Sequence, residues 1–419
     1  MEAMPNYLAK ILDKIPQKFE LKFLIGAKTS RQRAFNPRSF ILCLMHLCSG
    51  TNEEGYHQAL IKTFDDLKAP SKGALSYLRS RISFKFFKSV HETLLDSFGG
   101  HELLYEGYRL IAIDGWQITL PRTKDVIDHD FTGRATSKHR ESYMPKGFVV
   151  SAYDVLNKLT LSLSLNASQT EMEDARSILP DLPEKVICLY DRLYYSESFC
   201  RDHFRKGLKF IMRARSNACK EVAKLIKNDS QKTATKIIND GVDSYTIHFI
   251  KAQNPQGEIT VYATNLPRRW RNPKEMRNLY GMRWGVETCF GELSGTMKVQ
   301  QWHSKTVNGC LQELYTTVML ANLTRIVTAF TGCQKPRLPW QTTYSSPNFK
   351  VLLNCLTRHL NEYWQDISKY LPHFKRLIKR TTEKRKVNSR YYDRVIKRPA
   401  SSYKHIGSEW KGDKEYSLN

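Results

Sequence analysis

Two short apolar runs that each end at an aspartate constrain the fold of this chain more than any other feature. The runs span residues 109–113 and 186–190, are rich in β-forming residues, and are followed by Asp114 and Asp191. Such runs predict buried strands. We interpret Asp114 and the glycine after it as a tight turn that leads to a second strand, residues 117–121.

The segments around these runs predict an α/β core with a β-rich insertion. Further strands are predicted at 147–153, 158–165 and 208–212, and helices at 170–179 and 196–206. Residues 214–266 then interrupt this order with three more β-rich segments. If the two strands that end at aspartates are neighbours in the sheet, Asp114 and Asp191 lie side by side.

A third carboxylate stands in the segment 279–293, which has the apolar spacing of a helix. Asn272 before Pro273 is a typical helix start. Tyr280, Arg283 and Glu287 share one face of this helix, at offsets of zero, three and seven residues. An Arg-Glu pair on a helix is most often an ordinary surface ion pair, and that alternative stands beside a catalytic one.

Three carboxylates directed at one place repel each other unless a cation neutralises them. Magnesium accepts a few carboxylates and takes its other oxygen ligands from water or phosphate. Two such ions can activate a water or a 3′-hydroxyl and stabilise the leaving oxygen in a displacement at phosphorus. An oxygen-only donor set argues against zinc.

The charge of the chain predicts a polyanionic partner. Lys and Arg number 66 against 41 Asp and Glu, a formal net charge of +25. Nucleic acid is the commonest such partner; an anionic membrane surface is the alternative, although no run is long enough for a spanning helix. Residues 373–398 hold eleven Lys and Arg, with Phe374, Tyr391 and Tyr392 among them, which favours nucleic-acid contact over a merely solvated tail.

Two further features concern the compartment and the N-terminal region. Nine cysteines without a Cys-x-x-Cys pair, and no export signal, predict reduced thiols in a cytoplasm-like compartment. Residues 71–81 are compatible with a helix-turn-helix-like DNA reader, and an ordinary helical packing module is the alternative.

Taken together, these motifs resemble the DDE insertion-sequence transposases. The resemblance lies in Ile113-Asp-Gly, in Tyr190-Asp-Arg-Leu-Tyr, and above all in Tyr280-x-x-Arg283-x-x-x-Glu287, the signature of one bacterial group. It runs from about residue 71 to residue 317. The resemblance implies an RNase H-like catalytic core with a β insertion, flanked by an N-terminal helical domain and a C-terminal helical, basic region.

The composition of the chain and the resemblance together divide it into five expected regions. The expected regions are a DNA-end-binding domain (1–105), the first part of the catalytic core (106–213), the β-rich insertion (214–266), the rest of the core with the last acidic helix (267–332), and a DNA-contact and dimerisation region (333–419). The implied partners are double-stranded DNA, as terminal inverted repeats and as target, and a second copy in a synaptic homodimer. No membrane partner is expected, and the location is the bacterial cytoplasm.

The family's functional residues carry over by position. Asp114, Asp191 and Glu287 match the catalytic, metal-binding triad, which implies Mg²⁺, two ions, with Mn²⁺ as a substitute. Tyr280 and Arg283 match positions that hold DNA-end phosphates. The family's lysine seven residues after the glutamate is replaced here by Ser294, so Lys298 is the candidate substitute.

Further DNA-contact candidates come from residue type and place. Arg192 follows the second aspartate and Arg213 lies in the last core strand, each either structural or phosphate-facing. Trp270 is a candidate for stacking on a displaced base, with core packing as the stronger alternative. The sequence predicts a DNA transposase that cuts at element ends and transfers the 3′-hydroxyl to target DNA. The alternatives are a catalytically silent DNA-binding derivative and a divalent-dependent nuclease that does not transpose.

Overall fold

The computed structural model describes residues 13–26, 35–49, 55–64, 68–131, 144–167, 171–241, 243–253, 257–331, 338, 341, 343–362 and 371–386. All of them belong to the first of two compact units, Met1–Val387. The second unit, Asn388–Asn419, lies outside the described residues. The predicted contacts of Tyr391 and Tyr392 with nucleic acid fall in that unit.

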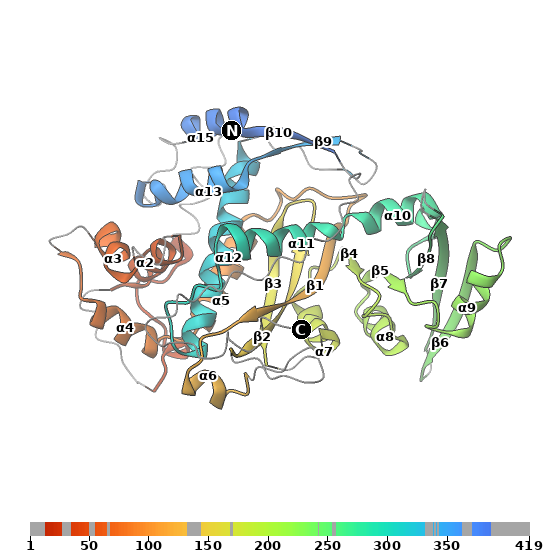
Figure 1. Ribbon diagram of the computed structural model, residues 1–419, viewed down its shortest axis with the longest axis horizontal. Coiled ribbons are helices and arrows are strands. Elements are labelled where there is room, and N and C mark those ends of the chain that lie inside the picture. Colours follow the sequence, from red (N-terminus) through yellow and green to blue (C-terminus); the bar gives the residue numbers. More distant parts are fainter. Residues whose placement is uncertain are drawn as a thin grey trace, which may run out of the picture. The chain divides into compact units, whose positions relative to one another are not determined.

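An eight-stranded mixed sheet runs through the described unit, from β1, β2 and β3 in the middle of the view to β6 and β7 near its right edge (Figure 1). Its strands are β1 (Arg109–Thr119), β2 (Lys146–Asp154), β3 (Leu159–Asn166), β4 (Val186–Tyr190), β5 (Lys209–Ala214), β6 (Thr233–Asp240), β7 (Asp243–Gln253) and β8 (Ile259–Thr264). They lie in the order β3-β2-β1-β4-β5-β8-β7-β6, in which β1, β4 and β5 are parallel and all other neighbours antiparallel. Five core strands and three strands from the predicted insertion therefore share one sheet.

Helices precede the sheet, connect its parallel strands and follow it. They are α2 (Pro37–Ser49), α3 (Gly55–Phe64), α4 (Lys72–Arg81), α5 (Lys85–Ser97), α6 (Lys124–Asp128), α7 (Glu171–Ile178), α8 (Glu197–Arg205), α9 (Lys220–Lys227), α10 (Pro273–Gly281), α11 (Trp284–Gly291), α12 (Val307–Phe330), α13 (Phe349–Arg358) and α15 (Leu371–Thr381). A second, two-stranded sheet pairs β9 (Thr343–Pro347) with β10 (Thr382–Lys386). Parallel strands need such crossover helices, and α7 and α8 lead into β4 and β5. The predicted α/β class is confirmed, and the strand order β3-β2-β1-β4-β5 agrees with the predicted RNase H-like core. Among the described helices, none is long and apolar enough to cross a membrane.

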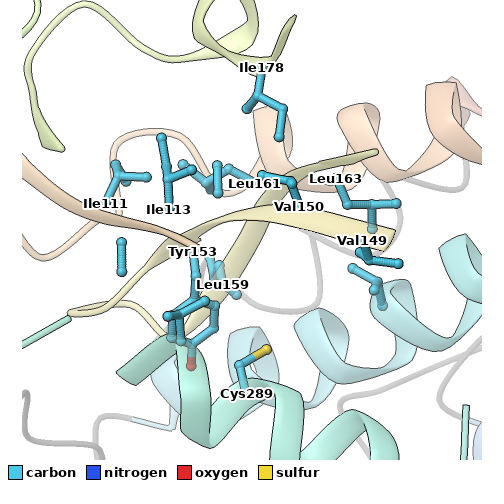
Figure 2. Close-up of a cluster of buried hydrophobic side chains, with 14 of the residues drawn as sticks. Ile111, Ile113, Val149, Val150, Tyr153, Leu159, Leu161, Leu163, Ile178 and Cys289 are labelled. Carbon is cyan, nitrogen blue, oxygen red and sulfur yellow. The ribbon is translucent and has the colours of Figure 1, made fainter. Parts of the chain in front are cut away.

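Helices cover both faces of the first three strands. Figure 2 shows Ile178 of α7 on one side of β1–β3 and Cys289 of α11 on the other. Side chains of β1, β2 and β3 between them are buried, among them Ile113, Val150 and Leu163. A fully buried aliphatic side chain stabilises the fold by roughly 1.5–3 kcal/mol. The apolar runs of the sequence thus fix α11 against the sheet.

The predicted strand-turn-strand around Asp114 is wrong, because β1 continues without a break from Arg109 to Thr119. The glycine at 115 serves a close approach rather than a turn. A Cβ built at Gly115 would lie 2.3 Å from Cε1 of Phe148, a ring of the neighbouring strand β2. Since local sequence shows the glycine but not the ring from β2, the turn was the natural misinterpretation.

The predicted helix from Asn272 onward is present but divided. Asn272 caps α10 by accepting the Glu275 amide at 2.8 Å, with Pro273 as the first helical residue, as predicted. The segment tightens at Met282 and Arg283, where the Arg283 amide donates to the Tyr280 carbonyl three residues back. The chain then forms α11, and this helical segment ends in a short π-helical turn, Glu292–Thr296.

The N-terminal helices are tied to α12 by a buried ion pair. Arg79 of α4 donates to Oε1 of Glu313 at 2.6 Å, and both side chains are about 5% exposed or less. Arg79 also donates to the Tyr56 hydroxyl and to the Gly309 carbonyl. One basic residue of the predicted DNA-reading helix therefore holds the fold together and does not face solvent.

Candidate active site

The register of the parallel strands brings the two predicted aspartates to one edge of the sheet. Ile113 of β1 pairs with Tyr190 of β4. Asp114 and Asp191 are the next residues along each strand, so they follow that pair side by side, as predicted. Neighbouring strands lie about 4.8 Å apart. The 77-residue separation in sequence is thereby reduced to one strand spacing.

Helix α11 adds Glu287 to this edge. The helix is held by the ring of Phe290, which packs on Trp116 of β1 with ring centroids 4.2 Å apart. Gly285 allows close approach to the end of β2, because a Cβ there would lie 3.3 Å from Cγ1 of Val155, the residue after that strand. These two contacts fix the orientation of α11, so that Glu287 on the same helix is directed toward Asp114.

A single guanidinium links two of the three carboxylates. Arg283 donates from Nη1 to Oδ2 of Asp114 at 2.7 Å and from Nη2 to Oε1 of Glu287 at 2.8 Å. The Arg283 side chain is only 6% exposed, against 17% for Asp114 and 37% for Glu287. Arg283, predicted to hold DNA phosphates, thus neutralises the acidic residues in this structure.

The third carboxylate is bonded by the tyrosine of the signature. The Tyr280 hydroxyl donates to Oδ1 of Asp191 at 3.4 Å, a long hydrogen bond. The Tyr280 ring packs on Tyr262 of β8, with centroids 5.0 Å apart. Tyr280, Arg283 and Glu287 therefore do share one face, and that face is turned toward both aspartates.

A fourth carboxylate, which the sequence did not reveal, lies beside the same edge. Glu171 begins α7, and its Oε1 is 3.4 Å from the position that a Cβ on Gly115 would take. Burial, together with the charges of Asp114 and Asp191, raises the pKa of Glu171 to about 7. An acidic residue in the first turn of a helix is so common that its position gave no signal.

The acidic residues are partly withdrawn from water, which changes their chemistry. Burial raises the pKa of Asp114 above its usual range, and the charges of Glu287 and Asp191 add to this, while Arg283 and the Gly115 amide oppose it. Burial disfavours the charged form of Arg283, but Tyr280, Asp114 and Glu287 nevertheless raise its pKa. The guanidinium stays ionised and compensates the buried negative charge.

The donor set suits a hard cation, although its present arrangement is built around Arg283. Asp114, Asp191 and Glu287 offer only carboxylate oxygens, the ligands that Mg²⁺ accepts. Within the described residues no three acidic, histidine or cysteine side chains are already placed to hold one ion. The three carboxylates fit the ion by their chemistry. Arg283 would have to release Asp114 and Glu287 when a metal ion binds.

Two of the remaining predicted contact residues lie away from this cluster. Lys298 is exposed, has a left-handed backbone (φ 52°), and lines a small cavity beside His303 and Glu313. Trp270 is 4% exposed and packs against Tyr105 and Tyr108. Its ring is not accessible for stacking on a base, which agrees with the packing alternative.

Arg192 and Arg213 lie close to the acidic edge instead. Arg192 follows Asp191 directly, and Arg213 follows Met212, the partner of Tyr190 in β5. Both line a surface pocket. Five of the predicted residues therefore form one cluster, and two arginines lie beside it.

Asp114 on β1, Asp191 after β4 and Glu287 on α11 thus lie at one edge of the sheet, and comparison with known proteins gives the family of the chain. The transposase DDE domain family matches residues 105–323, just over half of the chain, and the chain belongs to it. Within the matched range lie all three predicted acidic residues.

Individual proteins, among them the following two, are also similar to this chain. It is 26% identical over 138 residues to the protein named "Putative transposase InsZ" of Escherichia coli (strain K12), an alignment that spans 32% of this chain and 45% of that protein. The chain thus covers less than half of that relative's length. The second is a cryo-EM structure of the piggyBac transposase synaptic complex with hairpin DNA. The superposition covers 90% of this chain and 82% of the chain in that structure, with 11% sequence identity and a TM-score of 0.44.

Proposed function

We propose that this protein is a DNA transposase of the insertion-sequence type, in the group marked by Tyr280, Arg283 and Glu287. It cuts one strand at the ends of its element and joins the freed 3′-hydroxyl to target DNA. The observation that carries this proposal is the meeting of Asp114, Asp191 and the signature helix at one sheet edge. The family match and the net charge of +25 support it.

The three carboxylates hold divalent metal in this proposal, two Mg²⁺ ions or Mn²⁺ in their place. Magnesium held by these carboxylates would supply charge neutralisation at phosphorus and a more reactive water or hydroxyl nucleophile. The chain itself supplies position and charge. The strands hold Asp114 and Asp191 on rigid backbone, and α11 carries Glu287 to them.

Arg283 has two roles in succession. Without DNA it bonds Asp114 and Glu287 and limits their mutual repulsion. Its planar guanidinium also fits a phosphate with two parallel hydrogen bonds. When a DNA strand arrives, the phosphate replaces the carboxylates as partner of Arg283. Substrate binding and release of the acidic residues then occur together.

The substrate in this proposal is double-stranded DNA, first the terminal inverted repeats and then the target. A homodimer holds the two element ends in one complex. In this proposal the region before residue 105 reads the ends, and the region after 332 contributes DNA contacts and dimer contacts. The 26%-identical relative, whose name includes transposase, supports this class of substrate.

The decisive experiment removes the second aspartate. Asp191→Ala should retain binding to the terminal repeats, because its loss makes the surface more positive, while Mg²⁺-dependent nicking disappears. The matched control is Asp202→Ala, which lies on α8 and is ion-paired with Arg176 away from the acidic edge. Cleavage by Asp191→Ala at the rate of the control would contradict the proposal.

A silent DNA-binding derivative is the second candidate, favoured by the two hydrogen bonds that engage Arg283 with Asp114 and Glu287. An excision assay on the element's own terminal repeats, with Mg²⁺ and with Ca²⁺, separates the candidates. A transposase cuts and joins in Mg²⁺. A non-transposing nuclease cuts without joining, and a silent derivative binds without cutting.

A further inference from the structure

Three arginines line one surface pocket beside the acidic edge. Arg192 follows β4, Arg213 lies in β5, and Arg215 comes just after β5. The pocket has a volume of about 500 Å³, and its wall also contains Leu193 and Ile259. Arg192 and Arg213 are more than twenty residues apart in the sequence. The parallel pairing of β4 with β5 is what brings the three arginines together.

Within the described residues, no carboxylate pairs directly with the arginine pocket (Arg192, Arg213 and Arg215). No acidic residue is among the described residues that line it. Within the described part of the chain, none of the three guanidinium groups forms an ion pair with a carboxylate. Other arginines of the fold do have such partners, for example Arg79 with Glu313 and Arg325 with Glu292.

Arginines that gather at one place without a directly paired carboxylate favour an anionic ligand. A guanidinium is charged at all accessible pH values, so mutual repulsion cannot be relieved by loss of a proton. Phosphate groups match its planar donors in pairs. Ser216 and Asn217 at the same wall add neutral donors. The chemistry of the pocket is that of a phosphodiester site.

The register places this pocket next to the phosphate expected at the acidic residues. Ile113 pairs with Tyr190, and Tyr190 pairs with Met212. The residues that follow on three adjacent parallel strands are Asp114, Asp191 and Arg213, at intervals of about 4.8 Å. A DNA strand that crosses the sheet edge at the aspartates therefore continues over Arg213.

Apolar side chains at the rim suit the rest of a nucleotide. Leu193 is 50% exposed and Ile259 is 40% exposed, and both line the pocket. A sugar or a base edge that lies against them removes apolar area from water, while the phosphate contacts the arginines.

We propose that the arginine pocket binds the phosphodiester group adjacent to the one that is cut, with Leu193 and Ile259 against its nucleotide. This inference rests on the proposed function, since it takes DNA as the substrate of the neighbouring site. It assigns Arg215 a role for the first time and gives Arg192 and Arg213 a shared one. The pocket positions the strand and takes no part in bond cleavage.

The test measures DNA affinity against salt concentration for the full-length protein in metal-free buffer, where no cleavage interferes. Arg192→Gln and Arg215→Gln are compared with Lys206→Gln, which removes one exposed positive charge at the other end of β5. Each pocket variant should lose about eightfold in affinity at ~0.1 M salt, and the slope of log K against log salt should shrink by about 0.9 on duplex DNA. Lys206→Gln should match the wild type.

The same titration on single-stranded DNA identifies the form of the strand. A slope that shrinks by about 0.7 on single strands, with little change on duplex, assigns the pocket to an unpaired strand. Slopes unchanged on both substrates would overturn the proposal. Nicking by the wild type in Mg²⁺ is measured separately, so a protein that shows the slope change without any nicking retains the pocket and loses the transposase assignment.

Discussion

Replacing Arg283 should strengthen metal binding by the DNA-free protein. In the structure its guanidinium donates to Asp114 at 2.7 Å and to Glu287 at 2.8 Å. A divalent cation that takes these oxygens must compete with both bonds. In Arg283→Gln that competitor is gone, so the carboxylates accept Mn²⁺ more readily. Charge repulsion between the cation and the guanidinium acts in the same direction.

The size of the effect follows from the burial of the two bonds. The Glu287 side chain is 37% exposed, so water screens its bond and we give it little weight. Asp114 is 17% exposed, and a hydrogen bond to a charged group contributes about 1.5–3 kcal/mol. Because 1.4 kcal/mol is tenfold in affinity, the variant should bind Mn²⁺ about 10- to 150-fold more tightly.

The gain should depend on pH in a stated direction. Burial raises the pKa of Asp114, and Arg283 is the first of the groups that oppose this. Without Arg283 the pKa rises further, so protons compete with the metal at higher pH than in the wild type. The advantage of the variant is therefore greatest in alkaline buffer and declines toward acid.

Isothermal titration calorimetry with Mn²⁺ measures this, with Arg277→Gln as the control. Arg277 lies on α10 and donates to the Gln253 carbonyl rather than to a carboxylate. Equal or weaker Mn²⁺ binding by Arg283→Gln in alkaline buffer would refute the reasoning. Absence of binding in every variant would refute the metal site.

Two predictions concern stability. Gly115→Ala should cost about 1–3 kcal/mol of unfolding free energy, because the new methyl group meets the Phe148 ring. The control is Gly291→Ala, which has open space around it and should be neutral or stabilising. Urea unfolding compares the two variants, and equal midpoints would contradict the close approach at Gly115. Arg79→Met should cost about 3–5 kcal/mol of unfolding free energy, because it leaves Glu313 buried and unpaired. In a double-mutant cycle with Glu313→Leu, the double variant should lose much less stability than the two single variants added together. Strict additivity would show that the two residues are not coupled.

Regular elements were predicted because their signals are local. The apolar runs that became β4 and β5, and the Asn-Pro start of α10, depend only on residues a few positions apart. Asp114 and Asp191 were placed correctly because parallel strands that end together bring their last residues to one edge. The tight turn at Gly115 was wrong because its cause, the ring of Phe148, lies on another strand.

The sequence by itself thus determined the α/β class and the helix face that Tyr280 and Arg283 share with Glu287. It also indicated which three acidic residues come together. Only the tertiary structure decided what those side chains bond. The Arg283–Asp114 bond joins residues 169 apart, and the approach of Glu171 and the convergence of three arginines likewise depend on strand register. Periodicity fixes which face a residue occupies, whereas a partner across the fold is set by packing, and packing leaves no trace in neighbouring residues.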